Sequence, residues 1–200
     1  MAALTDKKSK YDRRYLNAVD AAASVFADKG YHGAGTIDIA NRLDIKQGSL
    51  YYYFRSKEAA LEAVCLEGIR HQVEHLESVI NADLSFPDVV REIVQYTLMS
   101  LKERADYMIV FDNDRQSIPL ERRGKIREQS HIYHKLLENI FEQARQKGEM
   151  KPDLDVYISV RAFTGLLSSV SSWYHTQQEI DLDRVVQQYS ELFLTGSLAG

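Results

Sequence analysis

The sequence predicts an all-α protein of about nine helices, because apolar residues recur at three- or four-residue intervals along most of the chain. Only 3 prolines and 10 glycines occur among the 200 residues, so the residues that break helices are scarce. No run alternates between polar and apolar residues as a half-buried strand would. The composition is 44% hydrophobic and 27% charged, which is typical of a soluble globular protein and excludes a disordered chain.

The sequence also predicts a soluble, cytoplasmic protein. No stretch reaches the run of about 18 apolar residues that a membrane span needs, so we expect no membrane partner. The first 14 residues are polar and basic, unlike a secretory signal. The single cysteine, Cys65, cannot form an internal disulfide, and its place on an apolar stripe predicts a buried thiol rather than a redox sensor.

Apolar spacing and helix-end residues predict the first four helices. A helix through residues 16–26 ends at Gly30, because glycine readily adopts the left-handed conformation that closes a helix. Two short helices follow, around residues 39–43 and over residues 47–53. The fourth helix begins after Ser56, a favourable N-cap residue, and its apolar stripe continues for about 25 residues.

Prolines delimit the remaining helices. Pro87 and Pro119 lie where helices can begin, and Pro152 lies in a break before a strongly apolar segment. The predicted helices cover residues 87–101, 105–114, 119–147, 156–174 and 182–194.

Charge is distributed unevenly between the two ends of the chain. Residues 1–58 contain ten Lys and Arg and seven Asp and Glu, a net charge of +3, whereas residues 59–200 carry −7. A basic N-terminal part suggests a polyanion partner for that part alone. We therefore expect a nucleic-acid-binding domain over residues 1–55 and a larger helical domain over residues 56–200.

Residues 36–54 predict a helix-turn-helix and read TIDIANRLDIKQGSLYYYF. Two short helices joined by a tight connection can pack on the first helix and leave one side of the second exposed to a DNA major groove. Leu50 and Phe54 are four residues apart and face the core in this arrangement. The exposed side is then polar and phenolic.

Four segments of the sequence carry a family resemblance: Gly30-Tyr31, Asp38-Ile39-Ala40, the run from Gly48 to Phe54, and the run from Ser56 to Ala59. Together they resemble the N-terminal region of TetR-family (TetR/AcrR) transcriptional regulators over about residues 12–66. The resemblance implies a homodimer with a three-helix helix-turn-helix DNA-binding domain, a connecting fourth helix, and a helical ligand-binding and dimerisation domain. It also implies that the last two long helices pair across the two-fold axis.

The resemblance, position by position, implies a set of DNA contacts in and around the second short helix. These residues are Thr36, Gln47, Gly48, Ser49, Tyr51, Tyr53 and Lys57. The charge of Lys46, which departs from the family pattern, adds one further candidate for phosphate or base contact. Glutamine can donate and accept at an adenine edge, and serine and tyrosine hydroxyls reach bases or phosphates. Glycine allows close approach of the backbone, and lysine adds salt-sensitive attraction to phosphate.

Several positions depart from the family pattern or leave alternatives open. Ile37 stands where a polar or basic residue is common, Asp44 where glycine is usual, and Lys46 where a serine N-cap is common. Three consecutive helical tyrosines cannot all face one way, and we expect Tyr52 to be the packed one. The basic N-terminal arm, with Lys7, Lys8, Lys10, Arg13 and Arg14, is either an additional phosphate contact or a solvated terminus.

The larger domain is expected to bind a hydrophobic effector in its apolar interior. The candidate lining residues are Tyr96, Met99, Met108, Phe111, Tyr133, Leu137, Phe163 and Leu167, all equally compatible with core packing. Residues 148–155 together with Trp173-Tyr174 loosely resemble the subgroup of these regulators that senses acyl-CoA thioesters. The basic run at residues 122–127 would suit the anionic part of such a ligand or is a solvated face. Another hydrophobic effector or a multidrug-type cation is the alternative ligand.

Enzyme and metal sites are not expected. No nucleophile with a paired base, carboxylate pair at metal spacing or phosphate-binding glycine loop occurs, so we predict no cofactor. His71 and His75 have a zinc-compatible spacing but lack a third ligand, and His131 and His134 are either cavity donors or plain surface. A helical dimeric adaptor without DNA binding would explain the last two helices but not the polar face of residues 46–53.

Overall fold

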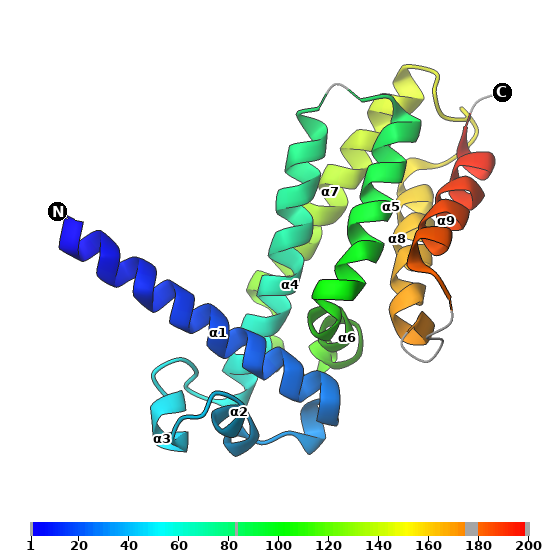
Figure 1. Cartoon of the computed structure of the whole chain (residues 1–200). Coiled ribbons are helices and arrows are strands. Elements are labelled where there is room, and N and C mark those ends of the chain that lie inside the picture. Colours follow the sequence, from blue (N-terminus) through cyan, green and yellow to red (C-terminus); the bar gives the residue numbers. More distant parts are fainter. Residues whose placement is uncertain (1, 83, 175–179, 199–200) are drawn as a thin grey trace. The chain divides into compact units, whose positions relative to one another are not determined.

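The computed structural model describes residues 2–82, 84–174 and 180–198, with side chains from residue 10 onward (Figure 1). Within this part of the chain every regular element is helical, and the only β-type pairing is an isolated bridge between Met150 and Leu198. The all-α prediction is therefore confirmed. The α-helices are α1 (Ala2–Gly33), α2 (Thr36–Arg42), α3 (Gln47–Leu50), α4 (Lys57–Ile80), α5 (Phe86–Glu103), α6 (Ala105–Asp114), α7 (Gly124–Gln146), α8 (Val156–Tyr174) and α9 (Leu182–Ser197).

The ends of several helices follow from the residues that the sequence singled out. The Ser56 hydroxyl accepts a hydrogen bond from the Ala59 backbone amide at 3.2 Å, which caps α4. Gly30 and Gly148 have φ of 69° and 74°, the left-handed conformation that ends a helical path. The chain does continue helically for a short stretch beyond Gly30, so this glycine marks a kink within α1.

Several predicted boundaries are wrong, and the largest difference is at the first helix, which begins at Ala2 rather than near residue 16. The seventh helix begins at Gly124 rather than at Pro119, because two short 3-10 helices, Arg115–Ser117 and Leu120–Arg122, occupy the intervening chain. The Arg123 guanidinium holds this segment by donating to the backbone carbonyl of Ile118 at 2.6 Å. The third helix ends at Leu50 instead of Tyr53, and the three tyrosines form a turn.

The chain forms two compact units, which are described separately. Unit 1 comprises Met1–Gly68 and Asp106–Ile126, and unit 2 comprises Ile69–Ala105 and Arg127–Gly200. These units are defined by contacts within the fold. The division at residue 55 between a DNA-binding and an effector domain is defined by function, and it stays a prediction. The segment at 106–126, which is distant in sequence from the N-terminal helices, is the feature that sequence reasoning missed.

This distant segment completes the interior of unit 1. The Tyr107 hydroxyl donates to Asp20 on α1 at 2.6 Å, and the Asp114 carboxylate accepts from the Tyr31 backbone amide at 3.2 Å. Val110 and Ile118 are completely buried in the same core as α1, α2 and α4. Tertiary contact, rather than chain continuity, therefore defines this unit.

Unit 2 is organised around α5, which packs against α8 and α9. Phenylalanines from α7, α8 and α9 meet in its interior: the ring centroids of Phe141 and Phe163 are 5.6 Å apart, and those of Phe163 and Phe193 are 4.6 Å apart. Phe86, at the beginning of α5, joins them edge-on to Phe141. These aromatic pairs fix the helices of the unit to one another.

No helix among the described residues is both long enough and apolar enough to span a lipid bilayer.

The connection between α2 and α3 contains the one non-glycine residue with positive φ in the described chain, Asp44 at 52°. The Ile45 amide donates to the Ala40 carbonyl at 3.0 Å, and the Asp44 amide donates to the Asn41 carbonyl at 3.1 Å. This pair of bonds is the Schellman arrangement, in which glycine is the usual left-handed residue. The departure from glycine noted in the sequence therefore places an aspartate in a conformation that L-residues rarely adopt.

We expect Asp44→Ala to lower the free energy of unfolding by about 1 kcal/mol, because alanine tolerates the left-handed conformation less well than aspartate. Asp44→Gly should leave stability unchanged or raise it by up to about 1 kcal/mol. Urea unfolding monitored by circular dichroism measures both, with Asp12→Ala on the exposed surface of α1 as a control. A more stable Asp44→Ala variant would contradict the assignment of strain to this turn.

Candidate functional site

The turn and the buried side of α3 determine which residues the helix-turn-helix exposes. Leu50 is 2% exposed and Phe54 is 3% exposed, as the four-residue spacing predicts, and both belong to the core of unit 1. Ile39 and Ala40 on α2 are buried in the same core. With these residues inside, the opposite side of α3 faces outward.

The outward side of α3 is polar and unobstructed. Lys46, Gln47 and Gly48 are exposed and Ser49 is half-buried. A Cβ added at Gly48 would meet no atom within 4 Å, so no internal packing requirement explains this glycine. An open backbone here is what close approach of an external surface needs.

Gln47 and Thr36 are joined directly. The Gln47 side-chain amide donates to the Thr36 hydroxyl at 3.0 Å. The bond brings together two predicted contact residues from the beginnings of α3 and α2. It also orients the amide, leaving its carbonyl oxygen and second N–H for another partner.

Lys57 is positioned by an aromatic ring on α1. Its Nζ lies 4.3 Å from the centroid of the Tyr31 ring, a cation–π contact. The Tyr31 hydroxyl in turn donates to the Glu58 carboxylate at 3.2 Å. The beginning of α4 therefore presents a lysine that is only partly buried and has a defined location.

The three tyrosines do not divide as the sequence predicts. Tyr52 is 82% exposed and Tyr51 is 53% exposed, whereas Tyr53 packs against the core of unit 1. The prediction that Tyr52 is packed and Tyr53 exposed is wrong. The Tyr53 amide bonds to the Leu50 carbonyl at 2.9 Å, and such i→i+3 turns have three residues per turn, which places Tyr53 on the buried side with Leu50.

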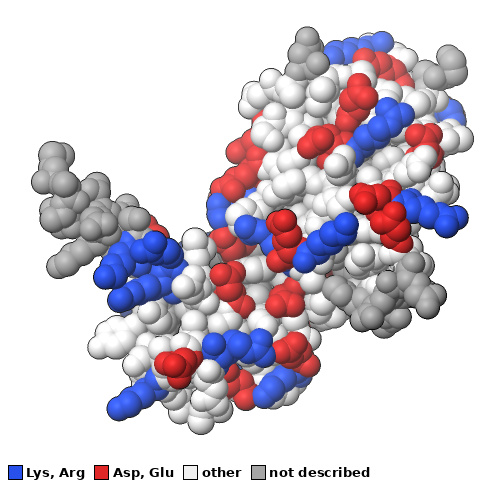
Figure 2. All heavy atoms as spheres, in the orientation of Figure 1, with Lys and Arg blue, Asp and Glu red and all other residues white. Residues whose placement is uncertain are grey.

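Basic residues gather at the beginning of the described side chains of α1. Lys10, Arg13 and Arg14 are exposed, and Figure 2 shows lysine and arginine atoms clustered there. The side chains of Lys7 and Lys8 lie outside the described residues. The exposed cluster provides positive charge on the same unit as the helix-turn-helix, but its geometry identifies no partner.

The predicted effector residues fall into both units. Met108 and Phe111 lie in unit 1, where Phe111 packs against the core. The six others lie in unit 2: Tyr96, Met99, Tyr133, Leu137, Phe163 and Leu167. Among these six, the last three are at most 2% exposed and fill the core, whereas the first three keep part of their surface exposed.

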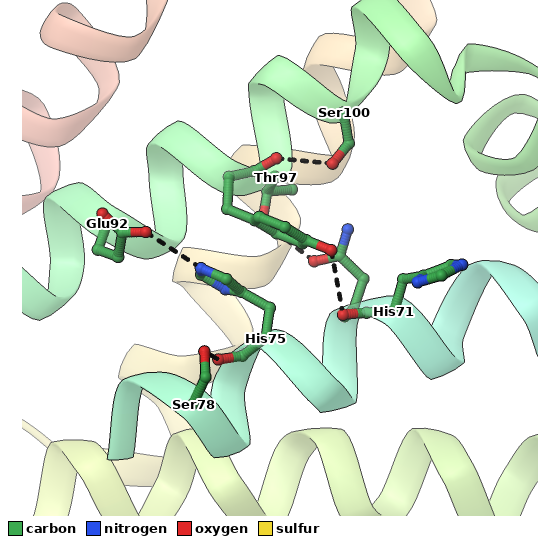
Figure 3. A network of polar contacts seen from close by, with 8 residues as sticks. His71, His75, Ser78, Glu92, Thr97 and Ser100 are labelled. Carbon is green, nitrogen blue, oxygen red and sulfur yellow. Dashed lines mark hydrogen bonds and ion pairs between the residues drawn. The ribbon is translucent and has the colours of Figure 1, made fainter. Parts of the chain in front are cut away.

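A polar contact that includes His75 and Glu92 joins α4 to α5 (Figure 3), and Tyr96 takes part in it. Its ring stacks on His75 with centroids 3.7 Å apart, and its hydroxyl donates to the His71 carbonyl at 3.3 Å. The His75 Nε2 lies 3.3 Å from the Glu92 carboxylate. Tyr96 and both histidines therefore connect the two helices, and among the described residues no group of three metal-ligating side chains gathers around them.

The remaining candidates mostly serve local structure. Arg122 pairs with Glu62 at 3.4 Å, and Arg123 donates to backbone carbonyls, whereas Lys125 and Arg127 are exposed. His134 donates from Nδ1 to the Ser130 carbonyl at 2.7 Å. Burial lowers the pKa of His134, which favours its neutral form.

Buried Cys65 behaves as predicted. It is completely inaccessible, and burial raises the pKa of its thiol to about 12. A thiol that stays protonated at neutral pH is a poor nucleophile, so Cys65 packs as a small apolar side chain.

Two family models match the chain. The model described as bacterial regulatory proteins, tetR family, matches residues 18–64, which include α2, α3 and the beginning of α4. The model described as tetracyclin repressor-like, C-terminal domain, matches residues 83–197. Together they cover both the helix-turn-helix and the larger helical region.

Curated relatives and solved structures agree with these models. The "Fatty acid metabolism regulator protein" of Bacillus subtilis is 27% identical over 184 residues, covering 92% of this chain and 95% of the relative. The structure of the transcriptional regulator FadR from Bacillus subtilis in complex with stearoyl-CoA is 29% identical, with a TM-score of 0.79 over 91% of this chain and 98% of that chain. The ketosteroid transcriptional regulator KstR2 of Mycobacterium tuberculosis, 20% identical with a TM-score of 0.83 over 94% of this chain and 96% of that chain, shares the fold.

The different burial of the tyrosines predicts different stabilities for their alanine variants. Tyr53→Ala should lower the free energy of unfolding by about 1–3 kcal/mol, because it removes a ring packed on the core. Tyr52→Ala should change it by less than about 0.5 kcal/mol, since the ring contacts mostly solvent. Thermal unfolding of the two variants measures the difference, and equal destabilisation would show that the turn is packed differently.

Proposed function

The chain belongs to the TetR family of bacterial transcriptional regulators, and we propose that it is a repressor that binds a palindromic operator as a homodimer and is released by an acyl-CoA thioester. Family membership confirms the prediction of a DNA-binding regulator rather than an enzyme. A ligand-binding helical domain accompanies the DNA-binding region in this family. The operator, dimer and effector are the parts of the proposal that need experiments.

The observation that carries DNA recognition is the exposed polar side of α3. Gln47, held by Thr36, presents an amide that can pair with the N6 and N7 edge of adenine. Exposed Lys46 and partly buried Lys57 and Ser49 lie on the same unit and suit phosphate contacts. Gly48 permits close approach of the backbone to DNA.

The tyrosine contacts follow the exposures of the rings. Tyr51 stays a proposed DNA contact because it is 53% exposed. Tyr52, at 82% exposed, joins it, since an exposed phenol can pack on sugar or a thymine methyl group and hydrogen-bond phosphate. Tyr53 has a smaller role, because its ring packs on the core and only the remaining surface can reach a partner.

A second copy of the chain would explain apolar side chains left exposed on the last two helices. Tyr157 and Ile158 on α8 are 57% and 66% exposed, and Leu192 on α9 is 64% exposed. Large apolar side chains exposed on neighbouring helices favour an interface between proteins. A two-fold dimer would place two α3 helices on successive half-sites, hence the palindromic operator.

The effector class rests on likeness to relatives together with the interior of unit 2. A fatty acid metabolism regulator aligns over most of this chain, and a relative of similar identity was solved with stearoyl-CoA. Unit 2 has an apolar interior of helices in which Met99 and Tyr133 keep accessible surface. An acyl chain would gain affinity from burial among such side chains.

Release of DNA requires that the effector bind one arrangement of the dimer more tightly than another. A ligand with equal affinity for both arrangements shifts nothing. We therefore propose that the acyl-CoA-bound dimer holds its two α3 helices at a spacing that the operator does not fit. Residues 1–55 are the proposed DNA-binding domain and residues 56–200 the proposed effector and dimerisation domain of a cytoplasmic regulator.

Alanine variants test the DNA contacts on an operator selected from random-sequence duplexes. Gln47→Ala and Tyr51→Ala should each weaken specific binding by about 1–3 kcal/mol if each removes a base contact. Lys57→Ala should weaken binding to all duplexes and reduce its salt dependence. Gel-shift titration at several salt concentrations measures these effects.

Gln95→Ala provides the matched control, since Gln95 is exposed on α5 of unit 2. Its affinity for the operator should equal that of the wild type. The helical adaptor interpretation would gain if neither Gln47→Ala nor Tyr51→Ala changed DNA binding, and a selected operator without two-fold symmetry would exclude the dimeric docking.

Stearoyl-CoA should dissociate the wild-type protein from its operator at micromolar concentration, because effector and DNA favour different arrangements. Fluorescence anisotropy of labelled operator measures the release. Free CoA and a hydrophobic cation are the controls for the anionic head group and for a multidrug-type pocket. Release by the cation but not by stearoyl-CoA would replace the proposed effector class.

A further inference from the structure

The carboxylate of Asp114, at the end of α6, holds the backbone of Tyr31 on α1. The helical path of α1 is broken at Gly30, and a new turn begins there, because the Gly30 carbonyl accepts from the Ala34 amide at 3.1 Å. The Tyr31 amide is among the first N–H groups of that turn, which have no acceptor within it. Asp114 accepts from this amide at 3.2 Å and so fixes the position of Tyr31 from a segment distant in sequence.

The Tyr31 side chain is also held at both ends. Tyr31 is 8% exposed, and its ring packs against Phe26 with centroids 5.7 Å apart. Its hydroxyl donates to the Glu58 carboxylate at 3.2 Å. The orientation of the ring therefore depends on the core of unit 1 and on the beginning of α4.

The Lys57 ammonium lies over the face of this ring. Its Nζ is 4.3 Å from the ring centroid, and an aromatic face attracts a cation without neutralising its charge. The adjacent Glu58 carboxylate is engaged by the Tyr31 hydroxyl. The Asp38 carboxylate pairs with Lys29 at 2.6 Å. Lys57 therefore presents a positive charge at a defined place, which suits attraction to a DNA phosphate.

We propose that Tyr31 is a positioning residue for DNA binding and that Asp114 acts through it, so that together they hold the Lys57 ammonium ready for an operator phosphate. The inference rests on the proposed function, in which Lys57 contacts phosphate. Asp114 is 83 residues from Tyr31 in sequence, so the local helix-turn-helix motif does not contain it. A lysine that is already held in place loses less side-chain entropy when it binds, which strengthens the contact.

A double-mutant cycle with Lys57→Ala tests whether Tyr31 acts through the lysine. Tyr31→Leu removes the aromatic face and should weaken operator binding about 2- to 5-fold per bound subunit, the effect of one cation–π contact. In the Lys57→Ala background the same change should have no further effect. Gel-shift titration of the full-length protein on its selected operator, at several salt concentrations, measures affinity and salt slope. Tyr31→Leu should move the slope towards that of Lys57→Ala, whereas Tyr31→Phe keeps the ring and should retain the wild-type slope.

Asp114→Ala tests the backbone bond while the ring stays in the chain, so it can be measured even if Tyr31→Leu does not fold. It should weaken operator binding by a smaller factor than Tyr31→Leu, and only when Lys57 is present. Asn113→Ala is the matched control, because Asn113 is exposed at the preceding position of α6, and its affinity should equal that of the wild type. The unfolding midpoint by circular dichroism shows whether each variant is folded.

Equal effects of Tyr31→Leu with and without Lys57 would overturn the positioning role, since Tyr31 would then act through packing alone. An unchanged affinity of Asp114→Ala would overturn the role of Asp114. If Lys57→Ala leaves binding unchanged while Gln47→Ala weakens it, the inference fails and the proposed function stands. If the wild type selects no operator, both fail.

Discussion

The burial of Leu50 and Phe54 in the core of unit 1 is the constraint that determines which side of α3 faces outward. Once these two side chains are inside, Lys46, Gln47 and Gly48 face outward without any further adjustment. The left-handed turn at Asp44 makes this possible, because it redirects the chain within a few residues and lets α2 and α3 share one core. The orientation of each exposed polar group on α3 therefore follows from the burial of Leu50 and Phe54.

The core that buries Leu50 and Phe54 also contains residues from a segment distant in the sequence, 106–126. The segment at 106–126 supplies Val110 and Ile118 to the core. Its Tyr107 hydroxyl donates to Asp20, and its Asp114 carboxylate accepts from the Tyr31 amide. Unit 1 is therefore more than three consecutive helices. Any rearrangement of that segment would disturb the packing of α1, on which α2 rests.

Unit 2 contains two tyrosines, Tyr96 and Tyr133, that the sequence analysis assigns the same candidate role but that have different surroundings in the structure. Both Tyr96 and Tyr133 follow apolar helical spacing, and both were candidates for an effector site. Tyr96 joins α4 to α5 through His75 and the His71 carbonyl, so its polar atom stabilises the fold. Tyr133 keeps part of its side chain accessible, and its ring contacts the His134 ring edge-on.

The sequence by itself determined the all-α class, most helix limits, the helix-turn-helix and the family, because periodic apolar residues, caps and a dense local motif act over a few residues. It also predicted the burial of Leu50, Phe54 and Cys65 from spacing alone. Only the tertiary structure decided that Tyr52 is exposed and Tyr53 packed, since the helix ends early and i→i+3 turns rotate the chain. Long-range packing likewise assigned residues 106–126 to unit 1, and no local pattern encodes a contact between segments so far apart.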